Sequence, residues 1–394
     1  MNLEPVHIVA AVRTPIGAYQ GGLSTLSAPK LGSLAIRAAL ERAKLAPERI
    51  GEVFMGNVLS AGIGQAPARQ AALGAGLPDT TPCTTVGKVC GSGLQAVVLA
   101  ARSIQVGANE IAVAGGMESM SRVPYYLDKA RTGYRMGHDR LIDGMIHDGL
   151  WDPYNDFHMG NAGELCAKEY GLTREAQDAF ASESYRRAVQ AQTSGAFDKE
   201  LVVVEIPQKK GPPLLVSRDE EPERGVPSKF PSLKPAFTPD GTITAANASS
   251  VNDGAAALVL ASERTVRDQK LVSLARIVGD GVSAQAPEWF TTAPARAITN
   301  TLNKLQLQTQ SIDLWEINEA FACVPMACAK LAGVDLERVN VNGGAVALGH
   351  PIGASGARIL TTLLWALEAR KLKRGLATLC IGGGEAVAVV IERS

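Results

Sequence analysis

Three residues in this sequence have side chains suited to acyl transfer, and each is embedded in glycines and other small residues. Cys90 lies in VCGSG, His350 in GGAVALGHPIGASGAR, and Cys380 in LCIGGGE. A cysteine can hold an acyl group as a thioester, a histidine can take the proton from that thiol, and a second cysteine can move a proton on and off a substrate carbon. Together the three contexts indicate covalent acyl transfer at carbon.

Cys90 comes directly before a predicted buried helix at 92–106. The N-terminus of a helix stabilises a thiolate, and its free N–H groups can hold a carbonyl oxygen that becomes negative during attack. His350 has the corresponding place before a second apolar helix at 355–369. If the two halves of the chain pack about a pseudo-twofold axis, both residues face one cleft. Taken singly, each has a structural alternative, an inert buried thiol or a loop histidine.

Cys380 lies at the C-terminal end of a predicted strand, where open α/β sheets place their active sites. Gly382 can offer a backbone N–H to an oxyanion, and Asn318, in NEAFA after the matching strand, can orient a water or donate to a carbonyl oxygen. The structural alternatives are a buried strand cysteine and a strand-end cap. Of the other four cysteines, all expected to be structural, only Cys83 is expected near the site; the four are Cys83, Cys166, Cys323 and Cys328.

Strand and helix signals alternate along the chain and recur in the same order, which predicts an α/β fold with largely parallel strands. The matching segments are EVFMGN with DLWEIN, CGSG with GASG, and EIAVAGGME with ATLCIGGGE. A series of matches in one order indicates a duplicated unit of about 120 residues per copy. The expected strands are 6–12, 51–58, 110–114, 271–278, 312–317 and 376–381, and the expected helices are 30–44, 92–106, 293–305 and 355–369.

A segment of different character, 119–247, interrupts the first copy. A helix is expected from about Thr173, followed by a stretch, 207–239, that contains eight prolines. Long irregular segments of this kind usually form binding loops or lids, so we expect an insertion over the active face. A strand–turn–strand signal at 241–262 then returns the chain to the first core. The expected units are 1–270, which contains the inserted loop domain, and 271–394.

The composition is that of a globular protein without a broad electrostatic field. In 394 residues, 46% are hydrophobic and 20% charged, and 39 basic residues balance 39 acidic ones. No large surface for nucleic acid or a membrane is therefore expected. Six cysteines without CxxC spacing, and no recognisable secretory leader, indicate free thiols in a reducing compartment and no zinc site. We expect a cytoplasmic protein.

The chain closely resembles the thiolases from end to end. The motifs that carry the resemblance are AAVRTPIGAYQGGLS, VCGSGLQAV, GGMESMSRVPYYL, NASSVNDGAAA, NEAFA, NVNGGAVALGHPIGASGAR and CIGGG. The resemblance implies two βαβαβαββ halves in a five-layered αβαβα arrangement, with an inserted loop domain that binds coenzyme A. It also implies an oligomer, for which we expect a homotetramer built as a dimer of dimers.

The resemblance further implies a role for each reactive group. Cys90 would be the acylated nucleophile, His350 its base, and Cys380 the acid and base at the α-carbon. One oxyanion hole would consist of His350 with Asn318 through a bound water, and the other of the backbone N–H groups of Cys90 and Gly382. The reaction would be ping-pong, joining two acetyl-CoA into acetoacetyl-CoA and coenzyme A, or running in reverse. Coenzyme A would be the carrier of the substrate, with no metal or redox cofactor required.

The pocket contacts implied by the resemblance come from the inserted segment and from NEAFA. Ser249 would lie against the pantetheine, and His158, Met159 and Phe321 would line the acyl end. Arg224 would be a candidate contact for the adenine or a phosphate. The segment DGMIHDGLWDPYNDFHMG is most similar to that of the short-chain, biosynthetic thiolases.

Some positions depart from the family pattern and leave acyl chain length and branching open. Ala246 and Ser250 lie near NAS where glycine is usual, and 287–294 reads PEWFTTAP where many relatives have an MGxGP-like stretch. Glu385 and Ala386 follow the last glycines where the usual sequence is GGGMGVA.

Three alternatives to a short-chain thiolase can be compared with the residues. A 3-ketoacyl-CoA thiolase of fatty-acid breakdown would have the same reactive groups and a roomier pocket. A β-ketoacyl synthase would share the fold and the nucleophile but is expected to have histidine or asparagine in place of Cys380. A catalytically inactive acyl-CoA or lipid binder would be expected to lack at least one of the reactive groups, and all are present.

Overall fold

A computed structural model describes residues 3–393 of the chain. Its main sheet has ten strands: β1 (Val6–Arg13), β2 (Gly17–Ala18), β3 (Glu52–Gly56), β4 (Cys83–Val86), β5 (Ile111–Ser119), β12 (Asn252–Ser262), β13 (Ala275–Ala284), β14 (Leu314–Ile317), β15 (Arg374–Ile381) and β16 (Glu385–Glu392). Their order is β14-β15-β16-β13-β1-β12-β5-β3-β4, with β2 paired to β12. The α-helices outside the inserted segment are α1 (Ala28–Ala43), α2 (Pro67–Ala75), α3 (Ser92–Gln105), α6 (Glu263–Asp268), α7 (Ala293–Leu305), α8 (Cys323–Ala332), α9 (Ala345–Leu348) and α10 (Ile352–Ala369).

Strand pairing is mixed, so the expectation of largely parallel strands is wrong. β3 pairs in parallel with β4 and β5, and β14 with β15. By contrast, β12 is antiparallel to both β1 and β5, and β16 is antiparallel to both β13 and β15. In the second half the physical reason is the connection: β15 reaches β16 through a short glycine turn with no crossover helix, and such a connection can only join antiparallel strands. In the first half the corresponding strands β5 and β12 are joined through the inserted segment.

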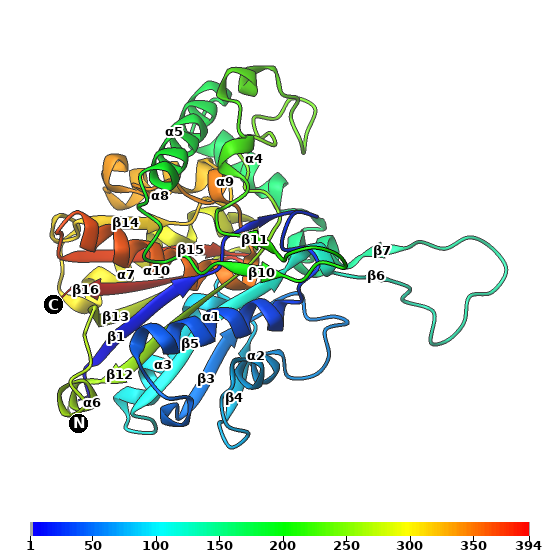
Figure 1. Cartoon of the computed structure of the whole chain (residues 1–394). Coiled ribbons are helices and arrows are strands. Elements are labelled where there is room, and N and C mark those ends of the chain that lie inside the picture. The colour runs from blue at the N-terminus through cyan, green and yellow to red at the C-terminus, as the bar shows by residue number, and fades with distance from the viewer. Residues whose placement is uncertain (1–2, 394) are drawn as a thin grey trace.

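The helices form three layers around the two halves of the sheet (Figure 1). Helices α1 and α2 pack on strands β1 and β3–β5 with β12, α7 packs on β13, β15 and β16 with α8 beside it, and α3 and α10 lie between the two half-sheets. This is the five-layered αβαβα arrangement of a thiolase fold. The half-sheets are joined edge to edge, because β1 and β13 pair through three residues, the first being Val6 opposite Ile277.

The repeat predicted from the sequence is visible in the order of elements. The first half runs β1-α1-β3-α2-β4-α3-β5 and closes with β12, which is βαβαβαββ. The second half follows the same order from β13 to β16, except that no strand corresponds to β4. In its place Val339 forms a single isolated bridge with Trp315. The duplication therefore holds for the helices that position the site and is incomplete at one sheet edge.

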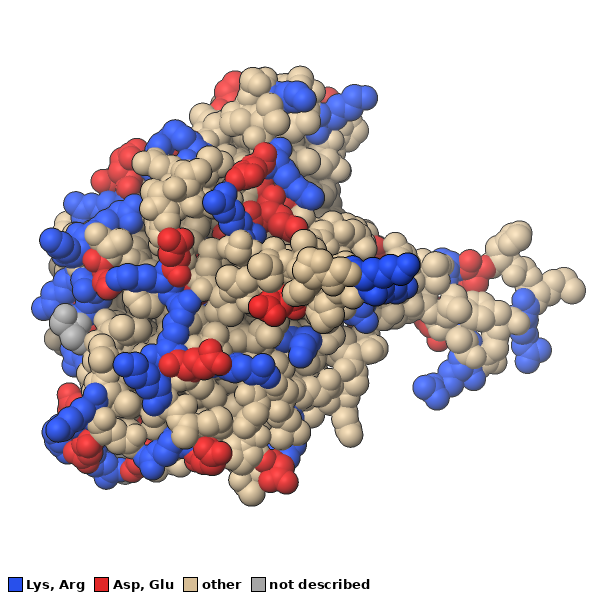
Figure 2. Space-filling view, viewed as in Figure 1, with Lys and Arg blue, Asp and Glu red and all other residues tan. Residues whose placement is uncertain are grey.

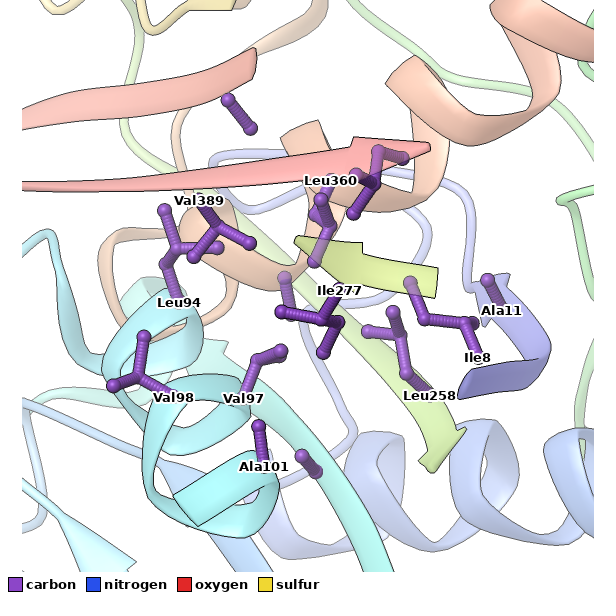
Figure 3. Packing of buried hydrophobic residues seen from close by; sticks show 14 of the residues in the cluster. Ile8, Ala11, Leu94, Val97, Val98, Ala101, Leu258, Ile277, Leu360 and Val389 are labelled. Atoms are coloured by element: carbon purple, nitrogen blue, oxygen red, sulfur yellow. The ribbon is translucent and has the colours of Figure 1, made fainter. Parts of the chain in front are cut away.

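The central helix layer is buried because α3 and α10 present apolar residues to both half-sheets. Leu94, Val97 and Val98 of α3 pack together with Leu360 of α10 and Val389 of β16 (Figure 3). Each of these side chains is 2% exposed or less. The expectation that the helix after Cys90 is a buried helix is confirmed.

The inserted segment carries two helices and an extended arm. The helices are α4 (Met159–Glu169) and α5 (Arg174–Thr193), and the short strands are β6 (Tyr125–Tyr126), β7 (Ile142–Asp143), β8 (Trp151–Asp152), β9 (Phe157–His158), β10 (Val204–Ile206) and β11 (Leu214–Val216). The arm, residues 125–143, leaves the body of the molecule as a long hairpin beginning at β6 and β7 (Figure 1).

The strand–turn–strand expected at 241–262 is only half right, because residues before β12 form turns. Asn247 explains this: its side chain accepts from the backbone N–H of Thr244 at 2.8 Å and donates to the carbonyl of Thr242 at 3.0 Å. Such side-chain bonds to nearby backbone compete with a strand ladder.

Charges are interspersed on the face seen in Figure 2, in keeping with a formal net charge of zero. Within residues 3–393, none of the helices combines the length and the apolar character needed to cross a bilayer.

Candidate active site

The N-termini of α3 and α10 meet because their first turns are made of small residues. A Cβ placed on Gly93 would lie 2.9 Å from the backbone nitrogen of Ala357, and one on Gly356 would lie 2.7 Å from the Cβ of Leu94. Real Cβ atoms do not approach other atoms this closely, so glycine is required at both positions. The close crossing brings Cys90, just before α3, toward His350, just before α10.

A cavity of about 260 Å³ opens above these two helix ends. Its lining includes seven of the residues predicted from the sequence, namely Cys90, His158, Met159, Ser249, Phe321, His350 and Gly382. Its other walls are mostly apolar and come from Met120, Leu150, Phe237 and Phe290, which sequence reasoning missed. The aromatic walls could have been suspected only for Phe290, since it lies in the PEWFTTAP departure from the family pattern.

Cys90 is held at a strained turn. The preceding residue, Val89, has a φ of 43°, a left-handed conformation that is rare for a β-branched residue. The hydroxyl of Ser92 closes this turn, donating to the carbonyl of Val89 at 2.7 Å and accepting from the N–H of Lys88 at 2.8 Å. Lys88 also forms an ion pair with Glu385, so this departure from the family pattern ties the turn to β16.

Burial raises the pKa of the Cys90 thiol to about 11. The backbone N–H groups of Gly382 and of Cys90 itself act in the opposite direction, because they stabilise the thiolate. These are the two donors that the thiolase resemblance implies for one oxyanion hole. At neutral pH the resting cysteine is therefore a protonated thiol that needs a base.

His350 is almost fully buried, and one of its two ring nitrogens is hydrogen-bonded to Ser355. Its backbone N–H donates to Asn252 Oδ1 at 2.8 Å, and its Nδ1 lies 2.6 Å from Ser355 Oγ. The other ring nitrogen, Nε2, has no hydrogen-bond partner among the described residues. Burial, and then the positive charge of Arg358, lower the pKa of His350 to about 3, so the ring is neutral.

Asn318 follows β14 and does not line the cavity. Its Oδ1 accepts from Arg358 at 3.4 Å, and Arg358 also lies 3.5 Å from a carboxylate oxygen of Glu316. The amide nitrogen of Asn318 is buried and, within residues 3–393, has no partner. Asn318 therefore shares with His350 a buried polar atom for which the described chain supplies no hydrogen bond, which is rare unless a water or substrate completes it.

Cys380, at the end of β15, is fully buried and lies behind the cavity lining in the same hydrophobic cluster as Met159 and Phe290. Burial, followed by the proximity of the Cys90 sulfur, raises its pKa well above the usual value for a thiol. Cys380 is therefore a protonated thiol at rest. The next residues, Gly383 and Gly384, have φ of 91° and 90° and turn the chain back into β16.

Glu118, in β5, is a buried carboxylate that sequence reasoning missed. Its two oxygens accept from Asn57 Nδ2 at 2.7 Å and from the backbone N–H groups of Val58, Leu59 and Gly353 at 3.0, 3.2 and 3.0 Å. Gly353 is in the first turn of α10, so Glu118 satisfies a free donor at the helix end that follows His350. An acidic residue in the apolar run IAVAGGMES was the available signal.

Three other predicted contacts are placed as follows. Ser249 donates its hydroxyl to the carbonyl of Ala320 at 3.0 Å. The ring of His158 stacks on Phe237 with 4.8 Å between the centroids. Arg224 is exposed, 3.8 Å from Glu221, and does not line the cavity.

The expectation that Cys83 lies near the site is wrong. Cys83 begins β4 and packs against the cluster under α1 and α2, outside the cavity lining. The cysteines that share the cluster of Cys380 are instead Cys166, Cys323 and Cys328.

Comparison with known proteins agrees with this geometry. The family description "Thiolase, N-terminal domain" matches residues 6–264, and "Thiolase, C-terminal domain" matches residues 271–393. The chain therefore belongs to the thiolase family.

Among its relatives, acetyl-CoA acetyltransferase 2 of Arabidopsis thaliana is 54% identical, over 100% of this chain and 98% of that protein. The acetyl-CoA acetyltransferase of Schizosaccharomyces pombe is 52% identical over 100% of both. Among solved structures, the Acat5 thiolase from Ascaris suum in complex with coenzyme A has a TM-score of 0.94 and 45% identity, covering 99% of this chain and 100% of that one. The Bacillus anthracis acetyl-CoA acetyltransferase has a TM-score of 0.98 and 41% identity over 100% of both chains.

Proposed function

We propose that this protein is an acetyl-CoA C-acetyltransferase, which reversibly condenses two acetyl-CoA into acetoacetyl-CoA and coenzyme A. The observation that carries this proposal is that Cys90 and His350, from different halves of the duplication, line one apolar cavity. The names of the full-length relatives support the substrate. Coenzyme A is a product of the condensation and a substrate of the reverse thiolysis, and acyl-CoA is the substrate form in both directions.

In the first half-reaction Cys90 attacks the carbonyl carbon of acetyl-CoA. The thiol proton moves to Nε2 of His350, which is neutral and has no partner among residues 3–393. The negative charge that develops on the carbonyl oxygen is held by preorganised donors, an effect worth about 3 kcal/mol per donor in such sites. Coenzyme A leaves as its sulfur takes the proton from His350, and the acetyl group stays on Cys90.

In the second half-reaction Cys380 acts at carbon. Its thiol proton passes to the neutral base His350, and the resulting thiolate takes a proton from the methyl group of a second acetyl-CoA. The carbanion attacks the carbonyl of acetyl-Cys90, the Cys90 sulfur leaves as a thiolate and takes the proton back from His350, and acetoacetyl-CoA is formed with both cysteines again protonated. The raised pKa of Cys380 suits this role, because a weakly acidic thiol has a strongly basic thiolate.

Two oxyanion holes serve the two carbonyl oxygens. The backbone N–H groups of Cys90 and Gly382 form one oxyanion hole, supported by their action on the Cys90 sulfur. Asn318 Nδ2 and His350 Nε2 hold a water that faces the other oxygen, supported by the lack of a partner for each atom within the described chain.

The bound coenzyme A extends from the cavity over the inserted loop domain, for which we retain the boundaries 119–247 within a first half of 1–270 and a second half of 271–394. Ser249 contacts the pantetheine, while His158, Met159 and Phe321 line the acyl end, as the lining of the cavity supports. Arg224 is retained only as a contact for the distal adenine or phosphate, since it lies outside the cavity.

We further propose a cytosolic homotetramer, a dimer of dimers. The arm at 125–143 supports the assembly, because Leu127, Met136 and Leu141 are exposed there with no part of the chain to cover them between residues 3 and 393. Large exposed apolar side chains on a projecting hairpin are typical of interfaces. A relative from Gibberella zeae is named as cytosolic, which supports the location.

The experiment that tests the function is thiolysis with free coenzyme A across 3-ketoacyl-CoA substrates of increasing chain length, on the wild type and on Cys380→Ser. We expect a strong preference for acetoacetyl-CoA and loss of at least 100-fold in kcat in the variant, because removing a general acid or base typically costs about 10²–10⁴. Equal or faster turnover of long chains would assign the protein to the 3-ketoacyl-CoA thiolases of fatty-acid breakdown. No thiolysis of any substrate would indicate a non-catalytic acyl-CoA binder.

A further inference from the structure

Ser355, in the sequence GASG at the start of α10, has a buried hydroxyl that contacts the proposed base. Its Oγ lies 2.6 Å from Nδ1 of His350 and 2.9 Å from the carbonyl oxygen of Pro351. Both Ser355 and His350 are buried, at 0% and 5% exposed. Within residues 3–393 Ser355 is therefore the one hydrogen-bond partner of the ring.

The direction of these two hydrogen bonds follows from counting protons. A hydroxyl has one hydrogen to donate, and a carbonyl oxygen can only accept. If Ser355 donates its hydrogen to the carbonyl of Pro351, as a helical serine commonly does to the carbonyl four residues before it, the Oγ lone pair faces Nδ1 and can only accept from it. Nδ1 must then carry the proton. In a neutral imidazole the other nitrogen, Nε2, is left with the lone pair.

The pseudo-repeat supports this direction. Ser92 has the same place in CGSG as Ser355 has in GASG, and its hydroxyl also donates backward to a carbonyl, that of Val89 at 2.7 Å, while it accepts an N–H from Lys88. Each serine thus closes the turn before its helix with its hydrogen and offers its lone pair to an N–H. In the second half that N–H belongs to a histidine ring.

We infer that Ser355 is a positioning residue that holds the neutral His350 ring in its Nδ1–H tautomer, so that the lone pair of Nε2 faces the cavity. This inference rests on the proposed role of His350 as the base for Cys90, and it adds what makes that base competent. With the proton on Nε2 instead, the ring could donate into the cavity but could not accept the thiol proton.

The ring must also be neutral for its tautomer to matter. The charged group that acts on His350 is Arg358, one turn further along α10, and it disfavours the imidazolium. Cys90, which lines the same cavity as His350, is an uncharged thiol. Ser355 and Arg358 therefore leave one protonation state of His350 for the resting enzyme.

The test is to locate the proton on the ring. Full-length protein with ¹⁵N-labelled histidine is studied by NMR, and the His350 signals are assigned by their absence in His350→Asn. We expect Nδ1–H in the wild type and a mixture, or Nε2–H, in Ser355→Ala. In that variant kcat for condensation should fall about 10- to 100-fold with KM for acetyl-CoA nearly unchanged, by analogy with the loss seen when a residue that orients a metal-bound histidine is replaced. Ser355→Thr keeps the hydroxyl and should retain the Nδ1–H tautomer.

Thr361→Val is the matched control. Thr361 is buried on the same helix and donates to the carbonyl four residues back, Ala357, at 2.9 Å, but it does not contact His350. This variant loses the same kind of hydroxyl bond and should keep both kcat and the His350 signals. A similar fall in kcat for Thr361→Val would mean that the effect of Ser355→Ala is structural, and would overturn the inference.

The failure of this inference is distinguishable from that of the proposed function. An Nε2–H tautomer in the wild type would overturn the inference even if no variant folded. So would a Ser355→Ala enzyme with full kcat while His350→Asn is inactive. Full activity of His350→Asn would instead overturn the proposed role of His350 itself.

Discussion

Cys90 and His350 are both uncharged at rest, because burial moves their pKa values in opposite directions. The thiol pKa is raised to about 11 and the imidazole pKa is lowered to about 3, so an ion pair of thiolate and imidazolium is disfavoured in the empty site. Proton transfer must then accompany attack on the substrate. The neutral site also avoids a standing charge in an apolar cavity.

This state predicts how Cys90 reacts with iodoacetamide in the absence of substrate. Only the thiolate reacts, and with a pKa near 11 the thiolate fraction increases about tenfold per pH unit throughout the range from pH 6.5 to 9.5. The rate of modification of the Cys90 peptide, followed by mass spectrometry with Cys90→Ala as the blank, should increase accordingly without a plateau. A plateau below pH 8 would indicate a preformed ion pair and contradict the neutral site.

Glu118 predicts a second effect of a single residue. Glu118→Gln replaces one carboxylate oxygen with an NH₂ group that faces N–H donors, leaving buried donors unsatisfied beside α10. We expect a loss of about 2–4 kcal/mol in the free energy of unfolding, since each unsatisfied buried group costs about 1–3 kcal/mol. Urea denaturation measures it, with Glu48→Gln at an exposed site as the control. Equal midpoints for the two variants would show that Glu118 does not hold the helix end.

At the scale of elements, the site depends on how closely α3 and α10 cross. Gly93 and Gly356 allow the two first turns to touch, and each reactive residue precedes its helix by two positions. The close crossing of α3 and α10 therefore brings Cys90 of the first half and His350 of the second half to the same cavity.

Gly356→Ala tests this crossing. The added Cβ would lie 2.7 Å from Leu94 Cβ, so the two helices must separate. Overpacking of this kind costs about 1–3 kcal/mol in the free energy of unfolding. We expect a lower Tm and a fall in kcat. Gly87→Ala is the control, because a Cβ there has no atom within 4 Å and the backbone φ is not positive. If Gly356→Ala matched Gly87→Ala in Tm and kcat, the close crossing would not be required.

The sequence predicted the helices of the site well and the strands less completely. The apolar runs after Cys90 and His350 are long and uninterrupted, and both form buried helices, although α10 begins at Ile352, three residues earlier than expected. The direction of β12 and β16 was missed because periodicity identifies a strand but carries no information on its partner. The cavity walls Phe237 and Phe290 were missed for the same reason, since they depend on contacts between distant segments.

The hydrogen bonds within the site were also beyond sequence reasoning. His350 and Ser355 are five residues apart, but their contact depends on a turn that only the fold defines. The carboxylate of Glu118 meets α10 from 235 positions away in the chain. Such hydrogen bonds cannot be predicted from the sequence, because they depend on how distant segments are placed in the folded protein.

At the scale of the whole molecule, the insertion is tied to the core by buried charges, while the arm stays free. Arg13 of β1 pairs with Glu200 and Asp219 of the insertion, at 2.6 Å in each case and with all three side chains buried. Between residues 3 and 393 the arm forms no such buried ion pair with the core, and its Leu127 and Met136 are exposed.

The exposed apolar side chains of the arm lead to a prediction about the mass of the proposed tetramer. Replacing Leu127 and Met136 with aspartate should weaken contacts between dimers, so light scattering after size exclusion should give a dimer where the wild type gives a tetramer. The fold of each protomer should be unchanged, since neither side chain is buried in it. A tetramer in the variant, or a wild type that is not a tetramer, would contradict the proposed assembly.

The central claim is that Cys90 carries the acetyl group between two molecules of coenzyme A. The direct measurement is to mix the enzyme with acetyl-CoA alone, quench it in acid, and identify the modified peptide by mass spectrometry. We predict one acetyl group on Cys90, removed by added coenzyme A, and none at this peptide in Cys90→Ala. Formation of acetoacetyl-CoA by Cys90→Ala, or an acetyl group held only at another residue during turnover, would contradict the account.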